Sequence, residues 1–125
     1  MPKEPISSQD APPPGGAYSQ AIAAGEFVFL AGQGPFRPDG SKVESSFEDQ
    51  VRQTFRNLAA VAEAAGASLA DAVRVGVFLR EMRNFAAMDE IYREFFAEPR
   101  PARTTVQSDL PGFEIEVDAV LLRER

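Results

Sequence analysis

The chain has 125 residues, a length that suits one compact domain with a core of its own. It contains neither cysteine nor histidine, which excludes disulfides, thiol nucleophiles, serine–histidine catalysis and the commonest zinc ligand. The net charge of −6 disfavours nucleic-acid binding, because proteins that bind phosphate backbones usually carry a basic patch. Any catalysis must therefore use arginine, lysine, tyrosine, carboxylates, hydroxyls, backbone groups and water.

Residues 1–16 are rich in proline, serine and glycine and end in PPPGG, so we expect an extended N-terminal arm. The arm contains no apolar signal segment, and no apolar run in the chain approaches the roughly 20 residues that span a bilayer. We therefore expect a cytoplasmic protein with no membrane partner, and a single domain over residues 17–125.

The first half of this domain is expected to form two strands and a helix. AYSQAIAA gives a short strand, Gly25-Glu26 a turn, and Phe27–Ala31 a second strand that the glycines of GQGP end. Ser45 and Glu48 fit a capping box at the start of a helix. Gly66 is a suitable cap at its end. The helix carries an apolar stripe of Val51, Phe55, Leu58, Ala62 and Ala65.

The second half repeats this alternation of strand and helix. Ser68–Asp71 forms a turn, and a strand follows in which Val73, Val75, Val77 and Leu79 share one face. Asn84 can cap a second helix with a stripe of Phe85, Met88, Ile91 or Tyr92, and Phe95; Pro99 and Pro101 prevent its continuation. The last strands are Ala102–Gln107 and Phe113–Leu122. The order β-β-α-β-α-β-β predicts an α+β fold with two helices on one face of a sheet, whose other face needs a partner.

The last strand, FEIEVDAVLL, places three acids in one row: Glu114, Glu116 and Asp118. Alternate residues of a strand lie about 7 Å apart on one face, so these charges repel each other unless water or cations compensate. The row is either a solvated face or includes a carboxylate that orients a water in a pocket. Arg103, in PARTTV, can balance one of these acids in a structural pair, or can await the carboxylate of a ligand.

Three further positions allow both structural and functional interpretations. Gly32, in AGQGP, marks either a bulge or a close backbone approach to a ligand. Tyr18 is either a core residue or a lid over a pocket. Asp89 lies off the apolar stripe of the second helix, where an acid is usually just solvated.

Several stretches in their order along the chain resemble the reactive-intermediate deaminases, the YjgF/RidA family that is also called endoribonuclease L-PSP-like. They are AYSQAI, FLAGQGP, QTFRNLAAVAEAAGAS, FAAMDEIYREFF, PARTTV and FEIEVDAV, and they extend from about residue 15 to residue 122. The resemblance implies a chorismate-mutase-like fold and a homotrimeric barrel with pockets between subunits. It also implies hydrolysis of 2-imino acids, or of their enamine tautomers, to 2-oxo acids and ammonia, without a cofactor or a metal.

Site residues follow from the resemblance position by position. Arg103 matches the arginine that grips the substrate carboxylate, and Glu114 matches the glutamate that positions the attacking water. Tyr18 and Gly32 match residues that line the pocket. Thr105 falls where a backbone carbonyl assists the water. Asp89 falls at a pocket position that is asparagine in the family; an acid facing the pocket there disfavours a second anionic group on the substrate.

Other departures from the family pattern indicate a divergent subgroup. Ala31 replaces a serine, Thr105 a cysteine, Ala17 a proline, and Asp118 an aliphatic residue. Two alternatives to the deaminase stay open. One is a non-catalytic trimer that binds small carboxylates, and the other is a ribonuclease or translation inhibitor, against which the acidic charge and missing histidine count.

Overall fold

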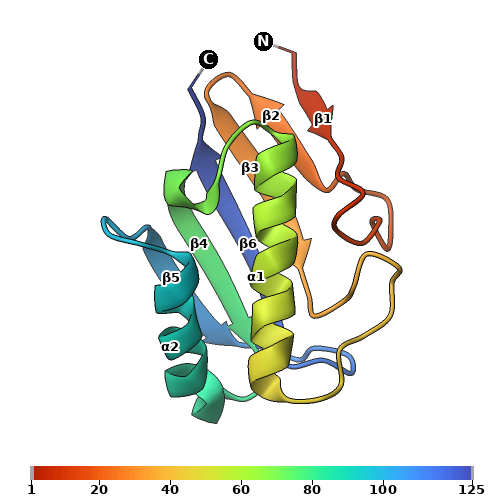
Figure 1. Cartoon of the computed structure of the whole chain (residues 1–125), viewed down its shortest axis with the longest axis vertical. Helices are drawn as coiled ribbons and strands as arrows, with labels where there is room; N and C mark the ends of the chain where they lie inside the picture. Colours follow the sequence, from red (N-terminus) through yellow and green to blue (C-terminus); the bar gives the residue numbers. More distant parts are fainter. Residues whose placement is uncertain (1, 125) are drawn as a thin grey trace.

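The computed structural model describes residues 2–124 as one six-stranded sheet with two helices packed across one of its faces (Figure 1). The elements are β1 (Glu4–Ile6), β2 (Ala21–Ala24), β3 (Phe27–Gln33), α1 (Phe47–Ala64), β4 (Ala72–Leu79), α2 (Phe85–Phe95), β5 (Ala102–Gln107) and β6 (Ile115–Leu122). The sheet order is β1-β2-β3-β6-β4-β5. β4 and β5 are parallel, and the other pairs are antiparallel. The expected α+β layout is confirmed.

The N-terminal arm contributes a strand that the sequence did not reveal. β1 pairs with β2 through Glu4 opposite Ala23 and Ile6 opposite Ala21, and the Ile6 side chain is buried. Proline content masks the strand pattern here. Pro5 is tolerated because β1 is the edge strand of the sheet. The arm is thus attached to the domain rather than merely extended.

Helix α1 begins one residue later than the predicted capping box. Its N-cap is Ser46, whose Oγ accepts a hydrogen bond from the Asp49 backbone N–H at 3.0 Å. Ser45 instead donates its hydroxyl to the Asp49 carboxylate at 2.6 Å. Two serines in a row made the register ambiguous. The apolar stripe of α1 is buried as predicted, and Gly66 follows the helix with φ +79°.

Two strands also differ from the predicted pattern. β3 continues to Gln33, because an irregularity in its pairing with β6 between Leu30 and Gln33 accommodates the glycine that was expected to end it. In β4, Val73 is exposed and Ala72 is buried, because the register with β6 shifts between Ala72 and Arg74. Both differences arise from local irregularities, which period-two alternation cannot show.

Helix α2, in the second half of the domain, follows the prediction with two exceptions. Met88, Ile91 and Tyr92 of α2 are buried, whereas Phe85 at its start remains partly exposed. Asn84 precedes the helix but makes no side-chain capping bond. Within residues 2–124, no helix has the length and apolar character that crossing a membrane requires.

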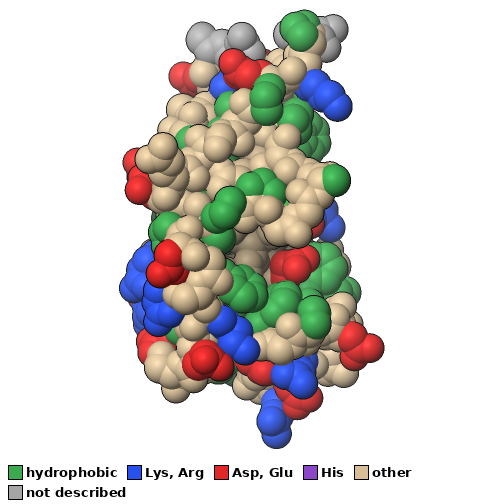
Figure 2. All heavy atoms as spheres, turned by 90° about the vertical axis from the view of Figure 1, so that its right-hand side faces the viewer, with side chains coloured by type: hydrophobic (Ala, Val, Ile, Leu, Met, Phe, Trp, Pro, Cys, Tyr) green, Lys and Arg blue, Asp and Glu red, His purple; other side chains and the backbone are tan. Residues whose placement is uncertain are grey.

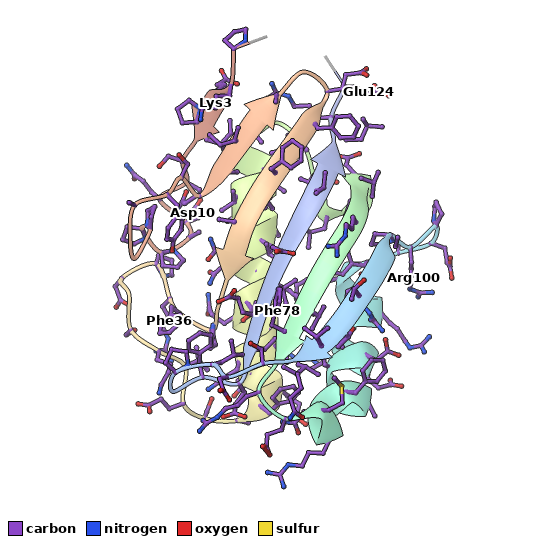
Figure 3. All side chains as sticks on the ribbon, turned by 180° about the vertical axis from the view of Figure 1, so that it is seen from behind. Lys3, Asp10, Phe36, Phe78, Arg100 and Glu124 are labelled. Carbon is purple, nitrogen blue, oxygen red and sulfur yellow. The ribbon has the colours of Figure 1, made fainter. Side chains whose placement is uncertain are left out.

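The two faces of the sheet have different environments. The face under the helices packs Val75, Val117 and Leu121 into the core. No helix covers the other face, which Figure 3 shows from behind. We call it the open face. Its exposed apolar side chains include Phe27, Phe29, Val106 and Leu122, and Phe29 is 48% exposed. An open apolar face agrees with the prediction that the sheet needs a partner.

Candidate functional site

Four of the six expected site residues line two cavities at different places on the chain. The first, which we call the arm cavity, measures about 360 Å³ and has Tyr18 and Gly32 in its lining. The second, the arginine cavity, measures about 330 Å³ and has Asp89 and Arg103 in its lining. Thr105 and Glu114 line neither cavity. The remaining residues of the arm cavity are Pro12–Gly15, Gln20, Gln33, Gly34, Phe36, Gly40, Phe113 and Glu116; those of the arginine cavity are Tyr92, Arg93, Arg100 and Pro101.

Sheet topology explains this separation. Arg103 lies on β5, the edge strand at one end of the sheet, and its strand partner is Val75 of β4. Val75 is buried under the helices, so Arg103 also points to the helix side. Gly32 lies on β3, and both β4 and β6 stand between β3 and β5. One chain therefore cannot bring Arg103 into the arm cavity.

Helix α2 holds the Arg103 guanidinium in a fixed position. Its Nη1 donates to Asp89 Oδ1 at 2.8 Å, and only 19% of the Arg103 side chain is exposed. The guanidinium carbon lies 4.5 Å from the centroid of the Tyr92 ring and 5.3 Å from that of Phe85. Within residues 2–124, Nε and Nη2 form no hydrogen bond, so one edge of the planar fork stays available to a carboxylate.

Asp89 is the acidic residue in the lining of the arginine cavity. Its Oδ2 also accepts from Arg93 Nη2 at 3.2 Å, so two guanidinium groups share its charge. The hydrogen bond from Arg103 lowers the pKa of Asp89 despite the opposing effect of burial. Of the alternatives left open for Arg103, a structural pair with an acid of the last strand does not occur in the described chain. The partner of Arg103 is Asp89, because β4 separates β5 from β6 and Arg103 points to the helix side.

Buried amides hold the walls of the arm cavity. Gln20 Nε2 donates to the carbonyls of Ser8 at 3.2 Å and Pro12 at 2.8 Å, and its Oε1 accepts from the Ser8 N–H at 2.6 Å. These bonds fix the proline-rich wall. The Tyr18 hydroxyl accepts from the Gly15 N–H at 3.0 Å, and Tyr18 is 52% exposed, so it lies at the cavity surface and not in the core. Figure 2 shows the hollow on this side of the molecule.

The opposite wall is held from α1. Asn57 is fully buried and donates to the carbonyls of Gly34 at 3.1 Å and Phe36 at 2.7 Å. Phe36 in turn meets Phe113 edge-on, with ring centroids 5.4 Å apart. Neither Gln20 nor Asn57 was identified from the sequence. The signal for Asn57 was a polar residue on an otherwise apolar face, because it lies one turn before the buried Val61.

The three acids of the last strand have three different environments. Glu116 lines the arm cavity, whereas the Glu114 carboxylate pairs with Arg80 at 3.2 Å. Asp118 lies over Gly76, where a Cβ would collide with its carboxylate. Burial, and then the neighbouring charge of Asp118, raise the pKa of Glu116. The structure therefore places Glu116, and not the predicted Glu114, beside Tyr18 and Gly32.

Thr105 pairs with Val77 of β4 and lies partly buried on the edge strand, away from both cavities. In the described part of the chain, no group of three or more His, Cys, Asp or Glu side chains is arranged to hold a metal ion. The side chains that line the two cavities offer guanidinium, carboxyl, phenol and amide groups.

The model of one protein family, described as Endoribonuclease L-PSP, matches residues 8–122. The chain belongs to this family. A RutC family protein of Pyrococcus horikoshii is 47% identical over 98% of this chain and 99% of its own. A protein of Dermatophagoides farinae named 2-iminobutanoate/2-iminopropanoate deaminase is 39% identical over 98% of each chain. The resemblance found in the sequence is confirmed at the level of the family.

Solved structures of the family share the fold throughout. Escherichia coli TdcF, crystallised with bound serine, superposes with a TM-score of 0.90 at 33% identity, over 97% of this chain and 99% of that one. The six-stranded sheet with two helices is therefore the fold of the L-PSP family. A member of the family thus accommodates an amino acid.

Proposed function

We propose that the chain hydrolyses 2-imino acids, or their enamine tautomers, to 2-oxo acids and ammonia, with Arg103 as the anchor of the substrate carboxylate. The observation that carries this proposal is the fixed guanidinium in the arginine cavity, which has one hydrogen-bonding edge unused in the described chain. A planar fork binds a carboxylate through two parallel hydrogen bonds. The deaminase named among the relatives supports this substrate class, and the serine bound to TdcF supports the binding of a small carboxylate.

The reaction requires little more than positioning. A protonated imine is already electrophilic, so a bound water in line with its carbon can attack once both are held. In this proposal Glu114 positions the water with help from the backbone carbonyl of Thr105, while Tyr18 and Gly32 line the pocket. Asp89 lies beside the anchor, and its carboxylate partly neutralises the positive charge with which Arg103 attracts the substrate.

The arrangement of the two cavities supports a homotrimer with sites between subunits. Arg103 and the Tyr18–Gly32 pair are on separate parts of one chain, so a shared pocket requires a second copy. The open face presents exposed Phe27, Phe29 and Leu122, whose burial against another copy would be favourable. We propose that these open faces pack inward and bring the arginine cavity of one copy to the arm cavity of the next.

The alternatives make different predictions. A non-catalytic trimer would bind small carboxylates through Arg103 without turnover. The family description also names ribonuclease action. The net charge of −6 counts against this activity, because it repels the phosphate backbone of RNA. The cytoplasmic location stays a prediction, which cell fractionation would test.

The decisive experiment generates 2-imino acids in situ from several amino acids with an amino-acid oxidase and traps the surviving imine with semicarbazide. We expect the wild-type chain to accelerate imine loss and Arg103→Ala to abolish the acceleration with its circular dichroism unchanged. Arg103→Lys is also expected to be badly impaired, because lysine cannot form the parallel pair of bonds. Binding of carboxylates without turnover would favour the non-catalytic trimer, and RNA cleavage surviving stringent purification would favour the ribonuclease.

A further inference from the structure

Glu116 has no part in the function proposed above, yet it is the one acidic side chain that lines the arm cavity in the described part of the chain. Within residues 2–124 its carboxyl forms no hydrogen bond and no ion pair, whereas the Glu114 carboxylate is held by Arg80 at 3.2 Å. A carboxyl that is partly buried, unpaired and turned into a cavity is available to a ligand.

The close contact between Glu116 and Gly32 fixes where this carboxyl lies. A Cβ at position 32 would stand 2.8 Å from Glu116 Oε2 and 3.1 Å from its Cγ. The side chain therefore rests directly against the β3 backbone, at the bulge between Leu30 and Gln33. Any larger residue at position 32 would push the carboxyl away. The need for glycine here is explained by the approach of this acid.

We propose that Glu116 transfers protons to and from the reacting atoms of the imino acid in the arm cavity. This inference rests on the proposed deaminase function. As water attacks C2 of the protonated imine, the C=N electron pair moves to nitrogen and the Glu116 carboxylate takes the proton that water loses. The acid then protonates the amino group, and the C–N bond breaks with its electron pair on the departing ammonia. The hydroxyl gives its proton to the Glu116 carboxylate as the C=O bond forms, and the departing ammonia takes that proton and leaves as ammonium.

The surroundings of Glu116 suit both halves of this cycle. Burial and the Asp118 charge raise its pKa, toward the range in which one carboxyl serves as base and acid near neutral pH. Arg74 of β4 lies beside Asp118 at Gly76. The lining of the arm cavity also includes the Tyr18 phenol, while its β3 and arm residues carry no charge.

The test compares wild type with Glu116→Gln, Asp118→Asn and Glu63→Gln in the imine-hydrolysis assay, over a range of pH. Glu63 is an exposed acid on α1 and provides the matched control. We expect Glu116→Gln to lower kcat about 100-fold with KM little changed, because proton transfer typically contributes that much or more. Asp118→Asn is expected to keep activity but to shift the acidic limb of the pH profile to lower pH, since a charge that raises the pKa of Glu116 is gone. Glu63→Gln should match wild type.

The outcomes separate this inference from the function on which it rests. An active wild type with a Glu116→Gln variant of normal kcat and pH profile overturns the inference alone. A wild type that hydrolyses none of the imino acids overturns the deaminase and this inference together. A purely structural role for Glu116 would lower activity in proportion to lost folded or assembled protein, so circular dichroism and sedimentation velocity accompany the assay. Full folding and assembly with a lost kcat support proton transfer.

Discussion

If Arg103 anchors the substrate as we propose, its salt bridge with Asp89 couples substrate affinity to stability at a single residue. Because the Asp89 carboxylate occupies Nη1 of the anchor, we expect Asp89→Asn to lower KM for 2-imino acids several-fold and to reduce stability at pH 7. The pKa of Asp89 is lowered in the folded state, so its contribution is present above the ordinary value of 3.8 and is lost as the pH falls below it. Urea unfolding at pH 7 and pH 3 should show that the free energy of unfolding falls less between these pH values in the variant than in the wild type. An equal loss in both proteins would contradict this assignment.

Tyr92 carries a buried hydroxyl that has no hydrogen-bond partner among the described residues. Its ring lies under the Arg103 guanidinium and stacks with Phe96, so the aromatic face is used while the polar atom is not. Removing an unsatisfied buried group is favourable, and Tyr92→Phe should raise the free energy of unfolding by about 1 kcal/mol. Equilibrium urea denaturation measures this directly. A loss of stability would mean that the hydroxyl has a partner in the assembled protein.

At the scale of elements, the sequence was informative wherever a period held over several turns or strand residues. The stripes of α1 and α2 and the alternation of β6 were all predicted, since each buries one face against the same core. Local irregularities were not predicted: the bulge in β3, the register shift in β4, and β1 within a proline-rich arm. The same limit applied to the site. The residue types were identified, but the pairing of Arg103 with Asp89 depends on α2 lying beside β5, which the sequence pattern does not show.

Beyond β1, the buried side chain of Gln20 holds Ser8 and Pro12 of the arm, and this makes their attachment testable. Gln20→Ala removes three hydrogen bonds to Ser8 and Pro12, which should cost about 1–2 kcal/mol and release residues 7–16. Hydrogen exchange followed by mass spectrometry should show faster exchange confined to the arm and β1. KM should rise because the proline-rich wall of the arm cavity is lost, while kcat on bound substrate changes less. Exchange that stays at the wild-type rate would show that β1 pairing alone retains the arm.

At the scale of the whole molecule, the proposed assembly through the open face makes activity depend on the oligomeric state. A glutamate in place of Phe29, which is 48% exposed on β3, would place a charge where we propose that copies pack together. We expect Phe29→Glu to sediment as a monomer and to lose activity, although Phe29 lines neither cavity. Ala64→Glu, on the exposed side of α1, adds the same charge and should change neither property. An active monomer would contradict a site shared between copies.

The two cavities predict a further property that only an assembled protein can have. If the anchor comes from one copy and the proton-transferring carboxyl from the next, then Arg103→Ala and Glu116→Gln damage different halves of each site. We expect Arg103→Ala alone to be inactive and Glu116→Gln alone to keep about a hundredth of wild-type kcat. After the two are unfolded together and refolded in equal amounts, a site is intact only when a chain with Arg103 adjoins a chain with Glu116. Random assembly of a closed ring gives about one quarter of the sites in this arrangement.

Recovery of about a quarter of wild-type activity on mixing, absent when each variant is refolded alone, would locate the site between copies. If instead both residues acted within one chain, every chain in the mixture would carry one defect and no activity would return.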